Sequence, residues 1–288
     1  MHPDTLVRDI DTLFSLPEVA LRLNQLINQP ETTPADLAEV MRCDPALSAR
    51  LLRLVNSAGR SQVQAVETVG QAIGLIGYRA LRDLVFATCA VEMFKGLPPE
   101  RVNMERFWLH AIACAIAARQ LALRGGRHDG ERLFITGLLH GLGQLVFFAR
   151  CPERYLRVLE QVDAKGAPLA EAERAEFGFD ADTVSAALLA HWHFPESIRE
   201  PIACRLHPER ASTAERTRDA AILRAAERIA CELRDCLLEG REPDAELLHA
   251  QARALGLVDS ALDGMPEAIN LEVVELFETL LPGSTLLP

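Results

Sequence analysis

Cys204 and His207 stand three residues apart and come nearest in this sequence to a nucleophilic pair. A thiol attacks as its thiolate, and a neighbouring imidazole can remove the thiol proton. The spacing makes the two residues neighbours on a helix, but no third group is evident that would orient the imidazole. No serine stands in the strained turn that a hydrolase nucleophile requires. The sequence therefore does not favour nucleophilic catalysis.

The chain has seven cysteines, an odd number, and no two of them form a CxxC pair. Cys231 and Cys236 are five residues apart, which places them on different helix faces and disfavours a zinc site between them. Most of the others lie inside apolar helical patterns, as Cys114 does. These features predict reduced core cysteines in a cytoplasmic protein.

Three glycines stand within the seven residues 137–143, in the order Gly-Leu-Leu-His-Gly-Leu-Gly. The segment lacks the spacing and the preceding strand of a dinucleotide-binding fingerprint. Glycines at such positions let two helices approach closely, although each weakens its own helix. We therefore interpret this segment as a packing feature rather than as a cofactor loop.

Length and charge narrow the possible functions. The 288 residues suffice for one large domain or two modest ones, and 49% of them are hydrophobic. Lys and Arg number 30 against 41 Asp and Glu, a formal net charge of −11, which disfavours broad binding to nucleic acid or to an anionic membrane. The amino-terminal residues have early acidic positions and no long apolar run, and no stretch of about 18 uncharged apolar residues follows. We therefore expect neither a signal peptide nor a transmembrane helix.

Helical periodicity runs through almost the whole chain, and no alternating pattern typical of strands occurs. The fold class predicted is therefore all-α. Residues 104–123 and 131–148 predict two long helices that are apolar on most faces, so they belong in the middle of a helical bundle. Further helices are expected over residues 17–27, from Pro34 onward, and over 46–55, 68–76, 78–94, 152–164, 168–176, 181–193, 196–206, 214–238, 243–255 and 266–281.

The last of these helices is amphipathic. Five apolar residues line one of its faces, namely Ile269, Val273, Leu276, Phe277 and Leu280. Such a face packs by default on the protein's own bundle. Contact with a partner helix or with a second copy of the chain is the alternative.

One distinctive block runs from Cys43 to Ala58 and contains Asp44-Pro45-Ala46-Leu47 and Asn56-Ser57. Further blocks are Leu16–Pro17, Ala72–Gly77, Leu81–Val85, Phe107–His110, Gly137–Gly143 and His191–Pro195. Together these blocks resemble the HDOD domain, a non-catalytic relative of the HD and HD-GYP metal-dependent phosphohydrolases that occurs in bacterial signalling proteins. The resemblance implies an amino-terminal helical subdomain over residues 1–96, an HD-like helical bundle over 97–235, and a helical extension over 236–288.

The resemblance also implies where a metal site would lie. HD enzymes hold divalent ions with a first His, a later His-Asp pair and a distal Asp, and these ions activate water against a phosphoester. On this chain the first His corresponds to His110, the pair to His140-Gly141, and the distal position to Glu227. Of the extra histidines in the cyclic-dinucleotide phosphodiesterases, one would fall near Ala181 and the other at His207, and only His207 is present.

Glycine at position 141 supplies neither charge nor a metal ligand, so we expect a degenerate pocket that holds no metal or other cofactor. Each of these residues also has an ordinary structural interpretation. His110 can be a hydrogen-bonded core histidine, and His140 can bond to a backbone carbonyl. Glu227 can be a solvated helix residue, and His207 can be a loop residue. Two histidines and a glutamate could still hold one zinc or iron ion.

Three functions remain open. The first, which we favour, is a non-enzymatic module for signal transduction that binds signalling proteins of unknown identity. Asn56, Ser57 and Arg60 are then candidates for the interaction surface, although a helix cap and turn explains the first two equally well. The second is a residual metal-dependent phosphohydrolase. The third is a sensor that binds a nucleotide or cyclic dinucleotide without hydrolysis.

Overall fold

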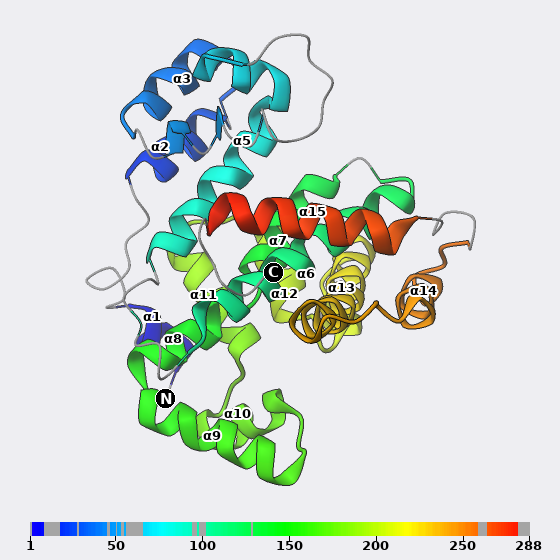
Figure 1. The fold of residues 1–288 in the computed structure, drawn as a ribbon. Coiled ribbons are helices and arrows are strands. Elements are labelled where there is room, and N and C mark those ends of the chain that lie inside the picture. The colour runs from blue at the N-terminus through cyan, green and yellow to red at the C-terminus, as the bar shows by residue number, and fades with distance from the viewer. Residues whose placement is uncertain are drawn as a thin grey trace.

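The computed structural model of the chain is built from α-helices, and its described residues contain no strand (Figure 1). It describes residues 2–8, 18–27, 29–44, 47–49, 51–52, 55, 66–93, 97, 102–127, 129–258 and 264–281. Within these ranges the helices are α1 (Pro3–Val7), α2 (Glu18–Ile27), α3 (Pro34–Arg42), α5 (Val69–Met93), α6 (Met104–Arg124), α7 (Gly130–Leu139), α8 (Leu142–Arg150), α9 (Pro152–Lys165), α10 (Leu169–Phe177), α11 (Ala181–His191), α12 (Glu196–Ala203), α13 (Ala214–Glu239), α14 (Ala245–Arg253) and α15 (Met265–Leu280), with a 3₁₀ turn η2 (Pro208–Arg210). The prediction of an all-α fold is confirmed.

Helix α6 is the centre of the bundle, and α7, α13 and α15 pack against it. Every residue from Ala111 to Ala118 on α6 is buried, which is the burial expected of a helix that is apolar on most faces. A Cβ atom on Gly137 of α7 would lie 2.7 Å from Cα of Ala115, so the two backbones touch at this glycine. The packing interpretation of Gly137 is therefore correct.

The sequence predicted a single helix over residues 131–148, and this prediction is wrong. The helix breaks at His140 and Gly141, which separate α7 from α8. Ser185 of α11 stabilises the break, because its hydroxyl donates to the carbonyl of His140 at 2.6 Å and accepts from the amide of Gly143 at 2.7 Å. These bonds satisfy backbone groups that would otherwise be lost at the two helix ends.

The amino-terminal helices α2, α3 and the first part of α5 form the upper lobe in Figure 1. A capping box starts α3, since the Thr33 hydroxyl accepts from the amide of Asp36 and the Asp36 carboxylate accepts from the amide of Thr33. Gly77 interrupts α5 with a φ of +80°, at the point where the sequence predicted one helix to end and another to begin. Helix α5 then continues to the bundle, where it contacts α7 and α15.

The carboxy-terminal helix α15 lies across α6 (Figure 1). Its predicted apolar face is turned inward, with Ile269, Val273, Phe277 and Leu280 at most 1% exposed. Arg119 of α6 also pairs with Glu272 of α15 at 2.6 Å. The extension therefore packs on its own bundle. Helix α13 runs through the boundary expected at residue 235 and ends at Glu239.

Among the described residues one segment, Arg132–Arg150, is long and apolar enough to cross a membrane by length and composition. It covers most of α7 and all of α8, and 83% of its apolar window is buried inside the bundle. Core helices of a folded bundle pass the same test of length and hydropathy, so this segment is weak evidence for a membrane span.

Candidate functional site

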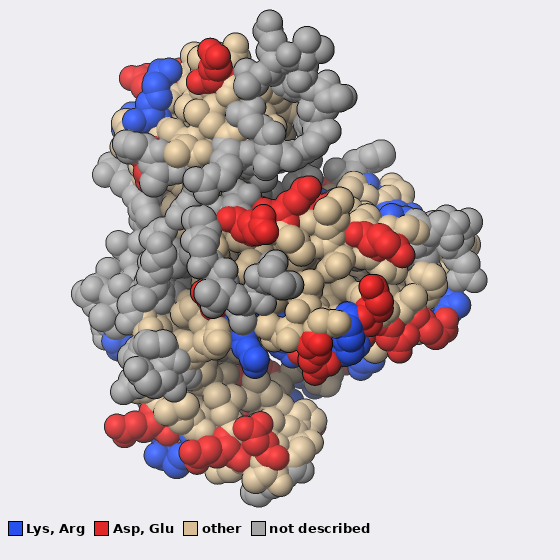
Figure 2. All heavy atoms as spheres, in the orientation of Figure 1, with Lys and Arg blue, Asp and Glu red and all other residues tan. Residues whose placement is uncertain are grey.

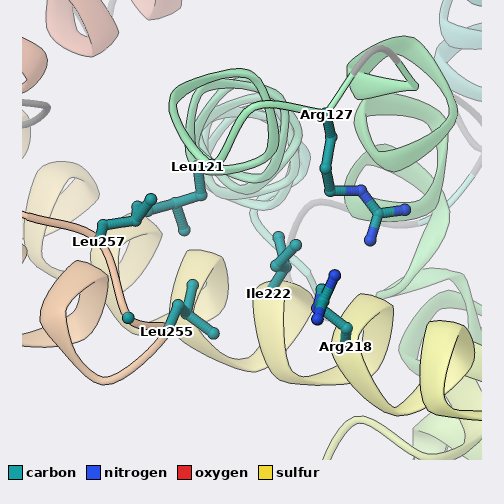
Figure 3. Close-up of a pocket in the computed structure, with 8 residues that line it drawn as sticks. Leu121, Arg127, Arg218, Ile222, Leu255 and Leu257 are labelled. Atoms are coloured by element: carbon teal, nitrogen blue, oxygen red, sulfur yellow. The ribbon is translucent and has the colours of Figure 1, made fainter.

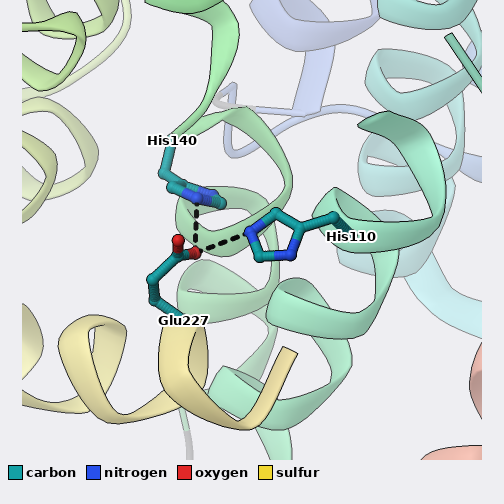
Figure 4. A group of neighbouring side chains, drawn as sticks. All are labelled: His110, His140 and Glu227. Atoms are coloured by element: carbon teal, nitrogen blue, oxygen red, sulfur yellow. Dashed lines mark hydrogen bonds and ion pairs between the residues drawn. The ribbon is translucent and has the colours of Figure 1, made fainter. Parts of the chain in front are cut away.

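His110, His140 and Glu227 come together from three different elements (Figure 4). His110 lies on α6, His140 directly follows α7, and Glu227 lies on α13. Both imidazole Nε2 atoms contact the same carboxylate oxygen, Oε2 of Glu227, at 2.8 Å from His110 and 2.9 Å from His140. The potential ligand atoms of the three residues all lie within 4.8 Å of one another. The structure therefore brings together three of the residues that the family resemblance implied.

The hydrogen bonds fix the charge of the two partners. A carboxylate only accepts hydrogen bonds, so both Nε2 atoms donate to Glu227. His140 also places Nδ1 2.5 Å from the carbonyl oxygen of Gly137, so both of its ring nitrogens face acceptors and it is an imidazolium. Burial opposes this charge, yet the Glu227 carboxylate raises the pKa of His140 well above its usual value. Burial likewise opposes ionisation of Glu227, yet His110 and His140 hold the pKa of its carboxyl well below the usual value.

A second ion pair borders this group. Arg205, which follows α12, donates from Nε and Nη2 to the carboxylate of Asp182 at 3.0 to 3.2 Å. Its Nη1 lies 4.0 Å from Oε1 of Glu227, the oxygen that the histidines leave free. Asp182 is 5% exposed, so the carboxylate needs the guanidinium to compensate its burial. Burial disfavours the charged guanidinium, but Asp182 and Glu227 outweigh it and raise the pKa of Arg205.

Sequence reasoning missed Arg205, Asp182 and Cys114 as neighbours of the site. Cys114 lies one helical turn after His110 on α6, and burial raises the pKa of its thiol, so it stays protonated beside His140. The i, i+4 spacing of His110 and Cys114 puts both residues on the same face of α6, and this spacing was a usable signal that Cys114 lies near the site. Nothing in the sequence marks Arg205 and Asp182 as partners, because 23 residues separate them.

Position 141 bears directly on metal binding. Gly141 is the first residue of the turn into α8, and a Cβ atom built on it would lie 3.3 Å from two ring atoms of Phe107. That distance is shorter than ordinary van der Waals contact, so the Phe107 ring would have to shift before a larger residue fitted there. The ring thus takes up part of the space that an aspartate at this position would need.

The remaining candidate residues lie elsewhere. His207 is 46% exposed at its side chain and contacts Glu209, so the structure does not bring it to the histidine–glutamate group. Its imidazole instead lies next to a surface carboxylate, since residue 207 stands in the loop that leads into η2. Asn56, Ser57 and Arg60 lie outside the described residues.

An all-helical bundle with two histidines and an acid at these positions defines an HD-like domain. The HDOD domain model matches residues 13–208, and the chain belongs to this family. A structure from Shewanella amazonensis, named as a candidate phosphohydrolase, is 28% identical with a TM-score of 0.76, and the alignment covers 96% of this chain and 97% of that one. An HDOD domain protein of unknown function from Geobacter sulfurreducens shares the fold at 24% identity and a TM-score of 0.76, over 97% and 98% of the two chains.

A curated relative, an uncharacterised protein of Treponema pallidum, is 27% identical over 192 residues. The matched segment is 66% of this chain but only 36% of that protein, so the relative is much longer than the part they share.

Proposed function

We propose that this chain is a non-catalytic signalling module whose HD-type pocket is degenerate. One observation carries the proposal: where the resemblance places the central aspartate, the chain has Gly141, and the Phe107 ring lies against that position. His110 and His140 both bond to Oε2 of Glu227 through Nε2, so the carboxylate oxygen that would face a metal ion is already occupied by protein groups, while Nδ1 of His110 is buried without a partner among the described residues. Binding of signalling proteins, rather than turnover of a substrate, is the function that this arrangement supports.

The donor set does not fit the metal centre of a phosphohydrolase. That chemistry needs ions that activate a water and neutralise a phosphoester, held by imidazoles together with carboxylates. Glu227 is the single carboxylate in the group, and its Oε1 faces the guanidinium of Arg205. His140 alone is arranged as a metal ligand usually is, with Nδ1 oriented by a backbone carbonyl. We derive no catalytic step from this site.

Charge balance supports the same proposal. The carboxylates of Glu227 and Asp182 face the His140 imidazolium and the Arg205 guanidinium, so protein groups already compensate their negative charge. A divalent ion would add positive charge to a buried group whose carboxylates already have cationic partners. Uncompensated charge in a buried site is strongly unfavourable.

We propose protein partners rather than nucleic acid or membrane. The net charge of −11 opposes attachment to phosphate-rich surfaces, and Figure 2 shows acidic side chains along α15 and over the α9–α10 region on one face of the molecule. Four large apolar side chains among the described residues are exposed, of which Val258 and Leu271 are 65% and 63% exposed. Single exposed apolar residues are ordinary on a protein surface, so this part of the proposal rests on the charge.

The test is the metal content of the purified, tag-free protein after incubation with Mn²⁺, Fe²⁺ or Zn²⁺, together with hydrolysis of bis(4-nitrophenyl) phosphate. We expect substoichiometric metal and no turnover for the natural sequence. The Gly141→Asp variant restores the missing carboxylate but meets Phe107, so we expect metal binding only in the Gly141→Asp/Phe107→Ala double variant.

Stoichiometric metal in the natural protein that disappears in His110→Ala, together with hydrolysis, would refute the proposal and favour the residual phosphohydrolase. A nucleotide sensor would show itself differently, as a rise in melting temperature with nucleotides. A ligand at 100 times its Kd stabilises the folded state by about 2.7 kcal/mol.

A further inference from the structure

A cavity lies beside the last turn of α6, lined by residues other than those of the histidine–glutamate group. Its volume is about 270 Å³. It is bounded by the end of α6 and the loop that follows, by the first turns of α13, and by the turn after α14. Figure 3 shows leucine side chains at one end of this cavity and two arginines at the other. The cavity is therefore amphipathic.

The apolar wall is firmly built. Leu121 of α6 and Ile222 of α13 are 1% and 4% exposed. Leu255 and Leu257 close the wall from the turn after α14, where Gly256 takes a φ of +81°. A Cβ atom on Gly125 would lie 3.6 Å from Cδ2 of Leu257, so the turn is seated directly on the loop after α6.

The two arginines have different roles. Arg127 donates from Nε and Nη2 to Asp129 at 2.8 and 2.6 Å, and Nη2 also lies 2.8 Å from Asp219. Within the described part of the chain, its Nη1 has no hydrogen-bond acceptor. Arg218 is exposed, and among the described residues its guanidinium has neither an acceptor nor an ion-pair partner. Arg127 belongs to an ion-pair network in which three acidic residues face three arginines, namely Asp129, Asp219 and Glu215 against Arg127, Arg132 and Arg216. Arg218 stands outside this network and supplies the uncompensated positive charge at the cavity.

Guanidinium groups bind carboxylates and phosphates through short, charge-assisted hydrogen bonds. The volume corresponds to about nine water molecules, below the usual range for sites that hold drug-sized ligands. We propose that this cavity binds a small organic anion, with its carboxylate or phosphate between Arg127 and Arg218 and a short aliphatic body against the leucines.

This site is independent of the proposed signalling function. Five of its eight lining residues lie after residue 208, beyond the segment that the family model matches. Arg218 precedes Glu227 by nine positions on α13, a distance of about 14 Å along the helix. Loss of one site can thus be measured while the other is intact.

The test is calorimetric titration of the full chain with 3-methylbutanoate and with 3-methylbutyl phosphate. The neutral 3-methylbutanamide and inorganic phosphate are titrated in parallel. We expect at least one of the two organic anions to saturate a single site with a Kd below about 1 mM. The amide and inorganic phosphate should each bind at least tenfold more weakly, because the amide lacks the charge and the phosphate lacks the aliphatic body. Comparison of the two organic anions shows which head group the arginines prefer.

The decisive variant is Arg218→Met, which keeps an unbranched side chain and removes the guanidinium from an exposed position. We expect it to raise the Kd at least tenfold. The matched control is Arg228→Met, which removes another exposed arginine from the same helix but outside the cavity, and should leave the Kd unchanged. Equal effects of the two variants, absence of saturation by both organic anions, or equal affinity for the amide would each overturn the proposal.

Discussion

The stability of this protein should fall as the pH rises from about 4.5 to 7, because of a single buried carboxyl on α10. Glu173 is 1% exposed. Its Oε1 accepts a hydrogen bond from the Tyr155 hydroxyl at 2.8 Å, and its Oε2 accepts one from the amide of Ala181 at 2.8 Å. Burial raises the pKa of Glu173 from 4.5 to about 7, and its two hydrogen bonds only partly oppose the shift.

The direction and the size of this pH effect follow from the difference between the folded-state and unfolded-state pKa of Glu173. Between pH 4.5 and 7 the folded state keeps a proton on Glu173 that the unfolded chain releases. The free energy of unfolding is therefore highest below pH 4.5 and falls as the pH rises through this range. A shift of about 2.5 pKa units corresponds to roughly 3 kcal/mol. At 2–4 °C per kcal/mol, this is a loss of about 6–12 °C in melting temperature.

The assay is urea unfolding at several pH values for the natural protein and for Glu173→Gln. Glutamine keeps the shape of the protonated acid and cannot ionise, so the free-energy difference between the two proteins should grow by about 3 kcal/mol from pH 4.5 to 8. Glu171→Gln is the control, because it removes an exposed carboxylate from the same helix. A difference that stays constant with pH would refute the reasoning.

Three further outcomes can be measured by chemical or thermal unfolding. Gly143→Ala should destabilise the fold by about 3 kcal/mol or more, because its Cβ atom would lie 2.0 Å from the carbonyl oxygen of Ala181 on α11. Gly74→Ala should instead stabilise by about 0.5–1 kcal/mol, since a Cβ atom at this helical position meets nothing within 4 Å. Asp219→Asn should lower the free energy of unfolding by roughly 3 kcal/mol, because this fully buried carboxylate pairs with Arg127, Arg132 and Arg216. A loss of less than about 1 kcal/mol in a urea titration would show that the three arginines are adequately solvated without the carboxylate.

Local patterns predicted the helices well, because helix starts are encoded by nearby residues. Thr33 and Asp36 form the capping box that starts α3. The apolar residues of α6 and α15 correctly predicted which faces of these helices are buried. The break at His140 was missed, because apolar residues continue through it and the residue that stabilises it, Ser185, comes 45 positions later. A single helix over 131–148 was the reasonable expectation from the segment alone.

The candidate site shows more strongly that local sequence does not predict contacts between distant residues. His110 and Glu227 are 117 positions apart, so no spacing rule joins them, and the family pattern alone placed them together. Arg205 and Asp182 had no such pattern, and their pairing emerges only when α11 and α12 pack. A cavity like that at Arg127 and Arg218 is equally invisible in the sequence, because it forms between segments that are far apart in the chain.

The histidine–glutamate group has a physical role that requires no metal. Glu227 of α13 bonds to His110 of α6 and to His140 at the α7–α8 break, so one carboxylate links three parts of the bundle. The His140 imidazolium and the guanidinium of Arg205 place positive charge beside the carboxylates of Glu227 and Asp182. Two histidines and an acid at HD positions are therefore consistent with a structural cross-link, and their presence alone does not argue for catalysis.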